Sequence, residues 1–270
     1  MNEVLKGLVV PVLTPFADSG AIDERAFVQH LDFLSGHGVQ RIMVNGTTAE
    51  FYSLLPEERK RLLKLARDHF RGFIVVHIGG CGLAQNKLEV QWANALGADA
   101  IAALPPIYPA ELPLTGIIQY FQALEAVAEV PFILYNFPKH TGNAITPEIL
   151  KAVPHAALKD SSQNLELMEH TPKYFIGSST HIFESIRQGG AGFVSATANV
   201  RPELYTAFEM RLEGARVEDA AVMKEEVQTY CAPFSVGGVP LLKQALARKV
   251  PGYPLNVRVP LQPLKLSTLY

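Results

Sequence analysis

One segment of the chain joins an apolar strand to a lysine. Residues 156–161 read Ala-Ala-Leu-Lys-Asp-Ser, so the apolar run ends at Lys159 and a polar turn follows. Lysine is rarely buried, and one at the end of an apolar run either reaches solvent or has a chemical task. Apolar surroundings lower the pKa of an amine, and the free amine can attack a carbonyl to form a Schiff base. A surface lysine that closes a strand is the alternative, and this segment alone favours it.

Three further stretches carry hydroxyl groups. Residues 46–50 (GTTAE) contain Thr47 and Thr48, whose hydroxyls and backbone amides suit a carboxylate; an ordinary helix cap is the alternative. Residues 134–138 (LYNFP) place Tyr135 at the end of an apolar run, where it is either core or, beside an amine, a proton carrier. Residues 105–109 (PPIYP) form a stiff loop that displays Tyr108.

Short β-rich runs alternate with helical patterns along most of the chain. Strands are expected at residues 8–13, 40–45, 73–78, 100–104, 132–135, 156–159, 174–177 and 192–195. Helix start signals lie between them, at Asp23, at residues 56–58 and at residues 146–148. Eight strand-helix repeats with fully apolar strands predict a (β/α)8 TIM barrel. Helical patterns at 201–213, 217–232 and 240–249 follow, so we expect a barrel over residues 1–215 and a C-terminal helical appendage over 216–270.

In such barrels active sites lie at the carboxyl ends of the strands, and Lys159, Tyr135, Thr47, Thr48 and Tyr108 all follow or end a predicted strand.

Composition narrows the function classes. The chain has 270 residues, 48% of them hydrophobic and 19% charged, which is enough to bury a large core. A net charge of −2 without basic clusters argues against nucleic acid and membrane partners and favours a small molecule. The cysteines Cys81 and Cys231 form no CxxC pair and are expected to be buried thiols in a reducing cytoplasm. Prolines interrupt the N-terminal apolar run and no basic leader accompanies it, so we expect a cytoplasmic protein.

No metal or nucleotide motif occurs in the sequence. HExxH, GxGxxG and GxxxxGK[ST] are all missing, so the proposed chemistry uses neither a metal nor another cofactor. His77, at the end of the third predicted strand, is expected to line the pocket or to be a satisfied core histidine rather than a ligand.

Four motifs together resemble one enzyme family. The stretches 14–16 (TPF), 46–48 (GTT), 134–138 with Thr141-Gly142, and 159–161 (KDS) are similar to the dihydrodipicolinate synthase and N-acetylneuraminate lyase superfamily of class I aldolases. The resemblance implies an imine between Lys159 and the ketone of pyruvate, or the pyruvate half of a longer 2-oxo acid. It also implies that Tyr135 is the central acid/base with Thr48 as its hydroxyl relay, and that Thr47 and Thr48 hold the carboxylate.

The same resemblance implies further positions around the site. Tyr108 matches the tyrosine that family members insert into the site of a neighbouring subunit, so a homo-oligomer, either a dimer or a tetramer, is expected. Gly177 and the backbone of Val194 match positions that line the pocket.

Several residues bear on the substrate. Dihydrodipicolinate synthases carry an arginine after the YN-P motif, but this chain has His140 there, which cannot offer the same bidentate fork. The preceding Lys139 can partly substitute for the arginine as a point charge. Ser161 and Ser179 can contact sugar hydroxyls. Residues 251–254 (PGYP) look closer to 2-keto-3-deoxygluconate aldolases, whereas 195–200 (SATANV) look more like dihydrodipicolinate synthase. Ala49 replaces the usual glycine of the GTTGE motif, so a slightly different turn is expected.

Three hypotheses follow. The leading one is a pyruvate-dependent aldolase acting on 2-keto-3-deoxy sugar acids, with pyruvate and an aldehyde as partners. The first alternative is dihydrodipicolinate synthase itself, which condenses pyruvate with aspartate semialdehyde. The second is a noncatalytic barrel that binds a keto acid, for which a nucleophile facing a phenol has no purpose.

Overall fold

The structure of the protein is a computed structural model, of which residues 5–214 and 217–264 are described. Eight parallel strands close into a barrel in sequence order, and the first strand pairs with the last through Leu8 and Phe193. The strands are β1 (Gly7–Pro11), β2 (Arg41–Val44), β3 (Phe73–Ile78), β4 (Ala100–Ala103), β5 (Phe132–Asn136), β6 (Ala157–Asp160), β7 (Tyr174–Ile176) and β8 (Gly192–Val194). The prediction of a (β/α)8 barrel is confirmed, with strand ends that differ by a residue or two.

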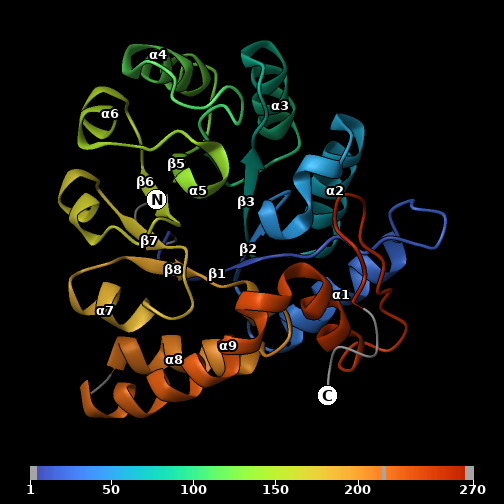
Figure 1. Ribbon diagram of the computed structural model, residues 1–270. Helices are drawn as coiled ribbons and strands as arrows, with labels where there is room; N and C mark the ends of the chain where they lie inside the picture. The colour runs from blue at the N-terminus through green and yellow to red at the C-terminus, as the bar shows by residue number, and fades with distance from the viewer. Residues whose placement is uncertain (1–4, 215–216, 265–270) are drawn as a thin grey trace.

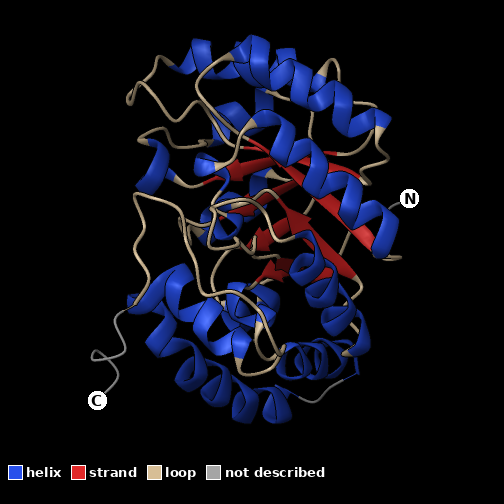
Figure 2. Ribbon diagram, turned by 90° about the vertical axis from the view of Figure 1, so that its right-hand side faces the viewer, coloured by secondary structure: helices blue, strands red, loops and turns tan. Residues whose placement is uncertain are grey.

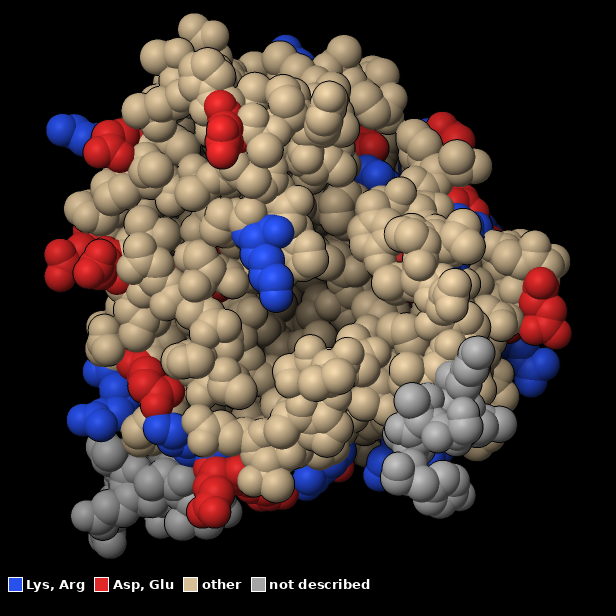
Figure 3. Space-filling view, viewed as in Figure 1, with Lys and Arg blue, Asp and Glu red and all other residues tan. Residues whose placement is uncertain are grey.

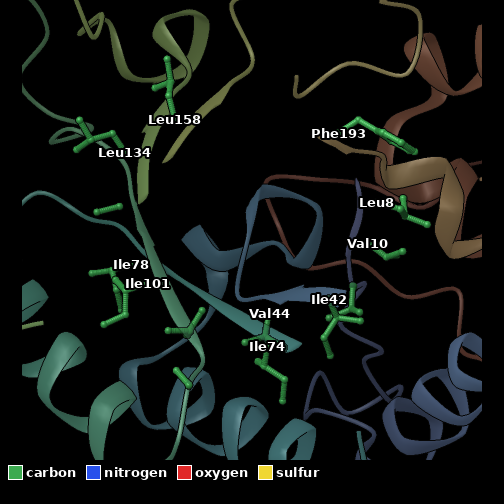
Figure 4. Close-up of a cluster of buried hydrophobic side chains, with 14 of the residues drawn as sticks. Leu8, Val10, Ile42, Val44, Ile74, Ile78, Ile101, Leu134, Leu158 and Phe193 are labelled. Carbon is green, nitrogen blue, oxygen red and sulfur yellow. The ribbon is translucent and has the colours of Figure 1, made fainter. Parts of the chain in front are cut away.

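The alternation of side chains along each strand makes two buried layers. Outward residues such as Leu8, Ile42 and Leu134 form the cluster in Figure 4, under the surrounding helices. Inward residues such as Val9 and Met43 form a separate cluster inside the barrel. Because both strand faces are covered, the strands read as unbroken apolar runs.

Helices surround the barrel, as Figure 1 shows. They are α1 (Glu24–Gly36), α2 (Pro56–His69), α3 (Leu83–Ala95), α4 (Leu114–Glu125), α5 (Pro138–Thr141), α6 (Pro147–Ala152), α7 (Ile182–Arg187), α8 (Pro202–Gly214) and α9 (Val217–Ala247). Four 3-10 segments interrupt the loops: η1 (Thr47–Ala49), η2 (Phe51–Ser53), η3 (Leu165–His170) and η4 (Ala196–Asn199). The expected start signals hold, since the Asp23 side chain accepts a hydrogen bond from the N–H of Ala26 at the start of α1.

The C-terminal part packs back onto the barrel. The two helices expected at 217–232 and 240–249 both lie within α9, where a kink at Gly238, with φ 55° and ψ −147°, separates two helices. Leu242 and Leu246 of α9 pack with Leu13 and Ala26, so the appendage covers the loop after β1 and helix α1. The predicted domain boundary at residues 215 and 216 lies outside the described residues, and the division into two domains stays a prediction.

The strands point towards one end of the barrel, where the longer loops gather (Figure 2). The same end faces the viewer in Figure 3, and its surface is hollowed near the centre. Charged side chains lie mostly around the edge of this face, and one basic group borders the hollow. Within the described residues no helix is both long and apolar enough to cross a membrane. A location in the cytoplasm stays a prediction.

Candidate active site

Lys159 lies near the carboxyl end of β6 and points into the barrel. It is paired in register with Tyr135 on β5. Its Nζ lies 3.2 Å from the centroid of the Tyr135 ring, and the whole residue is only 6% exposed. The interpretation of Lys159 as a surface residue that closes a strand is therefore wrong. The amine instead faces a phenol across adjacent strands, as the sequence predicts.

The surroundings of Lys159 lower the pKa of its amine. Burial lowers the pKa of the Lys159 amine, while Tyr135 and, to a smaller extent, Asp160 oppose the shift. Below the lysine, apolar side chains that include Met43 and Phe175 enclose a space of about 10 Å³. A space this small holds one water at most, so apolar side chains and not bulk water border this side of the amine. The lowered pKa raises the fraction of free amine at neutral pH, which is the nucleophilic form.

Tyr135 connects the amine to the turn that follows β2. Its hydroxyl lies 3.3 Å from Oγ1 of Thr47, and either oxygen can be the donor. Thr48 is the next residue of the same turn, but the threonine that contacts Tyr135 among the described residues is Thr47. The relay role of Thr48 stays a prediction. The site therefore contains a row of three groups in contact: the amine of Lys159, the phenol of Tyr135 and the alcohol of Thr47.

The turn after β2 is a short 3-10 helix, and its geometry is fixed from several sides. The Thr14 hydroxyl on the loop after β1 donates to the carbonyl of Ala49 over 2.9 Å. Ala49 is buried within the turn, and the left-handed conformation falls instead on Glu50, with φ 58° and ψ 40°. An alanine at position 49 is therefore compatible with the turn, because its backbone does not need the freedom of glycine.

His77 on β3 packs against the phenol from the other side. Its ring lies edge-on to Tyr135 with a centroid distance of 5.7 Å, and Nδ1 lies 2.7 Å from the carbonyl of Asn45. Nε2 has no hydrogen-bond partner among the described residues, so this histidine lines the interior but is only half satisfied. Burial lowers the pKa of His77 to about 3, which keeps the ring neutral at pH 7.

Gly177 and Ser161 meet beside the end of β7. A Cβ at position 177 would lie 2.3 Å from Oγ of Ser161 and 3.0 Å from the carbonyl of Asp160. The Gly177 N–H donates to that carbonyl over 2.6 Å. Only glycine leaves room here for the Ser161 side chain. Val194, at the end of β8, is 7% exposed and lies with the inward cluster of the barrel.

Ser179 belongs to a network of hydroxyls that the sequence did not predict. Its Oγ lies 2.8 Å from Oγ of Ser195 and 3.4 Å from Oγ1 of Thr197. Thr197 in turn contacts the Tyr205 hydroxyl, which lies 2.9 Å from Sγ of Cys231 on α9. The sequence shows that polar residues follow β8. No pattern in the sequence predicts that they contact a cysteine on α9.

Two expected groups, His140 and Tyr108, are exposed, unlike the buried Lys159. His140 lies on α5, and the centroid of its ring lies 4.2 Å from that of Phe137. The pKa of His140 is lowered, mainly because the ring is partly desolvated and to a smaller extent because the positive charge of Lys139 is close. Tyr108 is 74% exposed on the loop after β4. Its action in a neighbouring subunit stays a prediction.

The expectation for the cysteines is partly wrong. Cys231 is buried, but Cys81 is exposed, because it lies in a loop of glycines after β3 rather than in a strand or helix. Among residues 5–214 and 217–264, no three His, Cys, Asp or Glu side chains gather into a group that could hold a metal ion.

Comparison with known proteins places this geometry in a family. The model of the Dihydrodipicolinate synthetase family matches residues 4–269. A 4-hydroxy-tetrahydrodipicolinate synthase of Staphylococcus haemolyticus (strain JCSC1435) is 29% identical over 280 residues, covering 98% of this chain and 94% of that protein.

Solved structures share the fold across nearly the whole chain. YagE, a prophage protein of the dihydrodipicolinic acid synthase family from E. coli K12 solved with pyruvate, gives a TM-score of 0.91 at 24% identity, over 98% of this chain and 95% of that one. The 2-keto-3-deoxygluconate aldolase of Sulfolobus solfataricus, in complex with D-KDPG, gives 0.89 at 25% identity, over 97% and 92%. This chain thus belongs to the Dihydrodipicolinate synthetase family and is a lyase of the class I aldolase type.

Proposed function

We propose that the protein is a pyruvate-dependent aldolase that cleaves or forms a carbon–carbon bond in a 2-oxo acid through an imine on Lys159. One observation carries this proposal: a buried amine with a lowered pKa lies 3.2 Å over the ring of Tyr135, whose hydroxyl contacts Thr47. Lysines with lowered pKa form Schiff bases with carbonyl substrates. A noncatalytic keto-acid binder has no use for such an amine.

The proposed steps use this chain's own groups. The Lys159 amine attacks the ketone of the 2-oxo acid, and the ketone oxygen leaves as water with one proton taken from solvent, which gives a protonated imine. In the cleavage direction, the bond breaks between the carbon next to the imine carbon and the hydroxyl-bearing carbon beyond it. The electron pair of this bond moves towards the imine and forms an enamine. The hydroxyl-bearing carbon leaves as part of an aldehyde. The proton of the substrate's hydroxyl passes to Tyr135 as that oxygen becomes the aldehyde carbonyl, and the phenol passes its own proton on through Thr47 and Thr48 to solvent. Protonation of the enamine and addition of water then release pyruvate and restore the amine.

The proposed carboxylate site is the turn that carries Thr47 and Thr48. Hydroxyl donors here hold the carboxylate beside the phenol, and orientation of the ketone against the amine can lower the barrier by several kcal/mol. Gly177 and Val194 lie at the ends of neighbouring strands and shape the opposite wall.

The proposed substrate is a 2-keto-3-deoxy sugar acid. Ser161 and Ser179 supply hydroxyls near the strand ends, and the similar Sulfolobus protein is a 2-keto-3-deoxygluconate aldolase. Dihydrodipicolinate synthase is the second candidate, favoured by the 29% identical staphylococcal relative. Position 140 argues against dihydrodipicolinate synthase activity, because the exposed His140 cannot form the bidentate contact that an arginine makes with a carboxylate.

Reduction with borohydride in the presence of pyruvate tests the chemistry. The intact mass should increase by one reduced pyruvate in the native protein, and peptide mapping should place the adduct on Lys159. The Lys159→Ala variant should remain unmodified. A native protein that acquires no adduct, under conditions that fully trap a control aldolase, would refute the imine. Screening aldehydes, with aspartate semialdehyde among them, then separates the two candidate substrates.

A further inference from the structure

A fully buried ion pair joins the proposed carboxylate-binding turn to the C-terminal helix. Oε1 of Glu50, the residue directly after the turn, lies 2.6 Å from Nζ of Lys243 on α9. Both side chains are 0% exposed, and 193 residues separate them in sequence. Removing two charges from water is costly, so a pair this deep must be compensated by further contacts.

Lys243 has those contacts. Besides Glu50, its ammonium donates to the carbonyl of Asn256 over 2.6 Å and lies 4.5 Å from the ring centroid of Phe16. Two acceptors and one aromatic face match the three N–H groups of an ammonium. Burial lowers the pKa of Lys243 to about 8, and Glu50 opposes the shift. The lysine therefore ties the turn, the loop after β1 and the C-terminal segment together.

The second oxygen of Glu50 is held by the same segment. Oε2 accepts a hydrogen bond from the backbone N–H of Arg258 over 2.9 Å. The backbone of Glu50 is left-handed, with φ 58°, a conformation that is uncommon outside glycine. Its N–H closes the turn by donating to the carbonyl of Thr47 over 3.1 Å. The buried carboxylate thus fixes the residue whose unusual backbone sets the direction of the turn.

We propose that Glu50 and Lys243 are positioning residues, which hold the turn of Thr47 and Thr48 in the geometry that receives the carboxylate of the 2-oxo acid. This inference rests on the proposed function. Neither residue touches the reacting atoms in this arrangement. Their effect passes through the backbone of the turn, so it concerns binding of the carboxylate and not the reactivity of the Lys159 amine.

Trapping of the imine separates these two effects. The rate of borohydride trapping is measured against ketone concentration for the native protein, Lys243→Met and Glu50→Gln, with pyruvate and with acetone, which has no carboxylate. For both variants we expect the half-saturating pyruvate concentration to rise about tenfold, the size typical of a misplaced binding group. The trapping rate at saturation and the rate with acetone should stay within about twofold of the native values.

A control on the same helix is Lys224→Met. It removes the ion pair of Lys224 with Glu184, which lies away from the turn, and it should leave all rates unchanged. Circular dichroism checks the folding of each variant. If the loss of Lys243 prevents folding, Glu50→Gln decides, because glutamine keeps the side-chain size but has one oxygen for the two donors, Lys243 and the N–H of Arg258.

The outcomes are distinct. A native protein that traps no pyruvate refutes the proposed function itself. A native protein that traps pyruvate, with folded variants of unchanged half-saturation, overturns the inference. An equal loss with acetone would indicate general damage and would also contradict it. Opposite shifts in Lys243→Met and Glu50→Gln would overturn the inference as well, because the two variants change the local charge in opposite directions and such a result would indicate that charge acts through space.

Discussion

Replacement of Tyr135 by phenylalanine separates the ring of this residue from its hydroxyl. The ring is 1% exposed and packs over the Lys159 amine, and these contacts remain in the variant. The hydroxyl contact with Thr47, at 3.3 Å, is lost. One ordinary hydrogen bond contributes about 1 kcal/mol to stability, so Tyr135→Phe should fold with only a small change in the free energy of unfolding.

The expected effect on catalysis is much larger. A positioned proton carrier contributes about 10²–10⁴ in rate, so kcat for cleavage of the 2-oxo acid should fall by that factor, which corresponds to about 3–5 kcal/mol in the barrier. Imine formation should survive, because Lys159 keeps its position and its apolar surroundings. Borohydride trapping with pyruvate and steady-state cleavage assays on the same preparation measure the two steps.

The pH profile gives an independent check. Burial lowers the pKa of Lys159, and the contact with Tyr135 opposes this shift. Without the hydroxyl, the pKa of the amine should fall further, and the acidic limb of the trapping rate should move to lower pH. A variant that cleaves substrate within about twofold of the native rate would refute the role of Tyr135. A shift of the limb to higher pH would refute the electrostatic reasoning.

Three further predictions concern substrate access and stability. Gly177→Ala places a Cβ 2.3 Å from Oγ of Ser161, so we expect KM to rise about tenfold and the double variant with Ser161→Ala to recover part of the loss in steady-state assays. Burial lowers the pKa of His30 to about 3, so between about pH 6.5 and pH 3 the unfolded chain binds a proton at this residue and the folded protein does not. The free energy of unfolding should therefore fall as the pH drops through this range. In urea titrations at several pH values, His30→Gln should make the free energy of unfolding less dependent on pH. Asn136→Ala removes a bond of 2.9 Å to the Asp160 carboxylate and should cost about 2–4 kcal/mol of unfolding free energy, measured by urea denaturation against native protein.

The barrel was predictable because its signals are local. Each strand is a short apolar run that ends in a turn, and Asp23 caps α1 through a hydrogen bond within its own segment. Lys159 and Tyr135 were predictable for a related reason. They end successive strands, and parallel pairing in sequence order must bring them side by side.

The remaining features depend on contacts between distant segments. The pair of Glu50 and Lys243 spans 193 residues, and neither residue stands in a pattern that marks it as buried. The same holds for the contact between Tyr205 and Cys231, because a lone cysteine on a helix gives no sign of its neighbours.

The adjacency of Lys159 and Asp160 bears on the lowered pKa of the proposed nucleophile. Successive residues of a strand point to opposite faces, so the carboxylate of Asp160 points away from the barrel interior. It is occupied there by donors that include Asn136 at 2.9 Å and the Tyr174 hydroxyl at 2.7 Å. Among the described residues, no carboxylate lies within ion-pair distance of the Lys159 amine. A neighbouring acid would otherwise favour the ammonium form; here the strand separates the two, and burial can lower the pKa of Lys159.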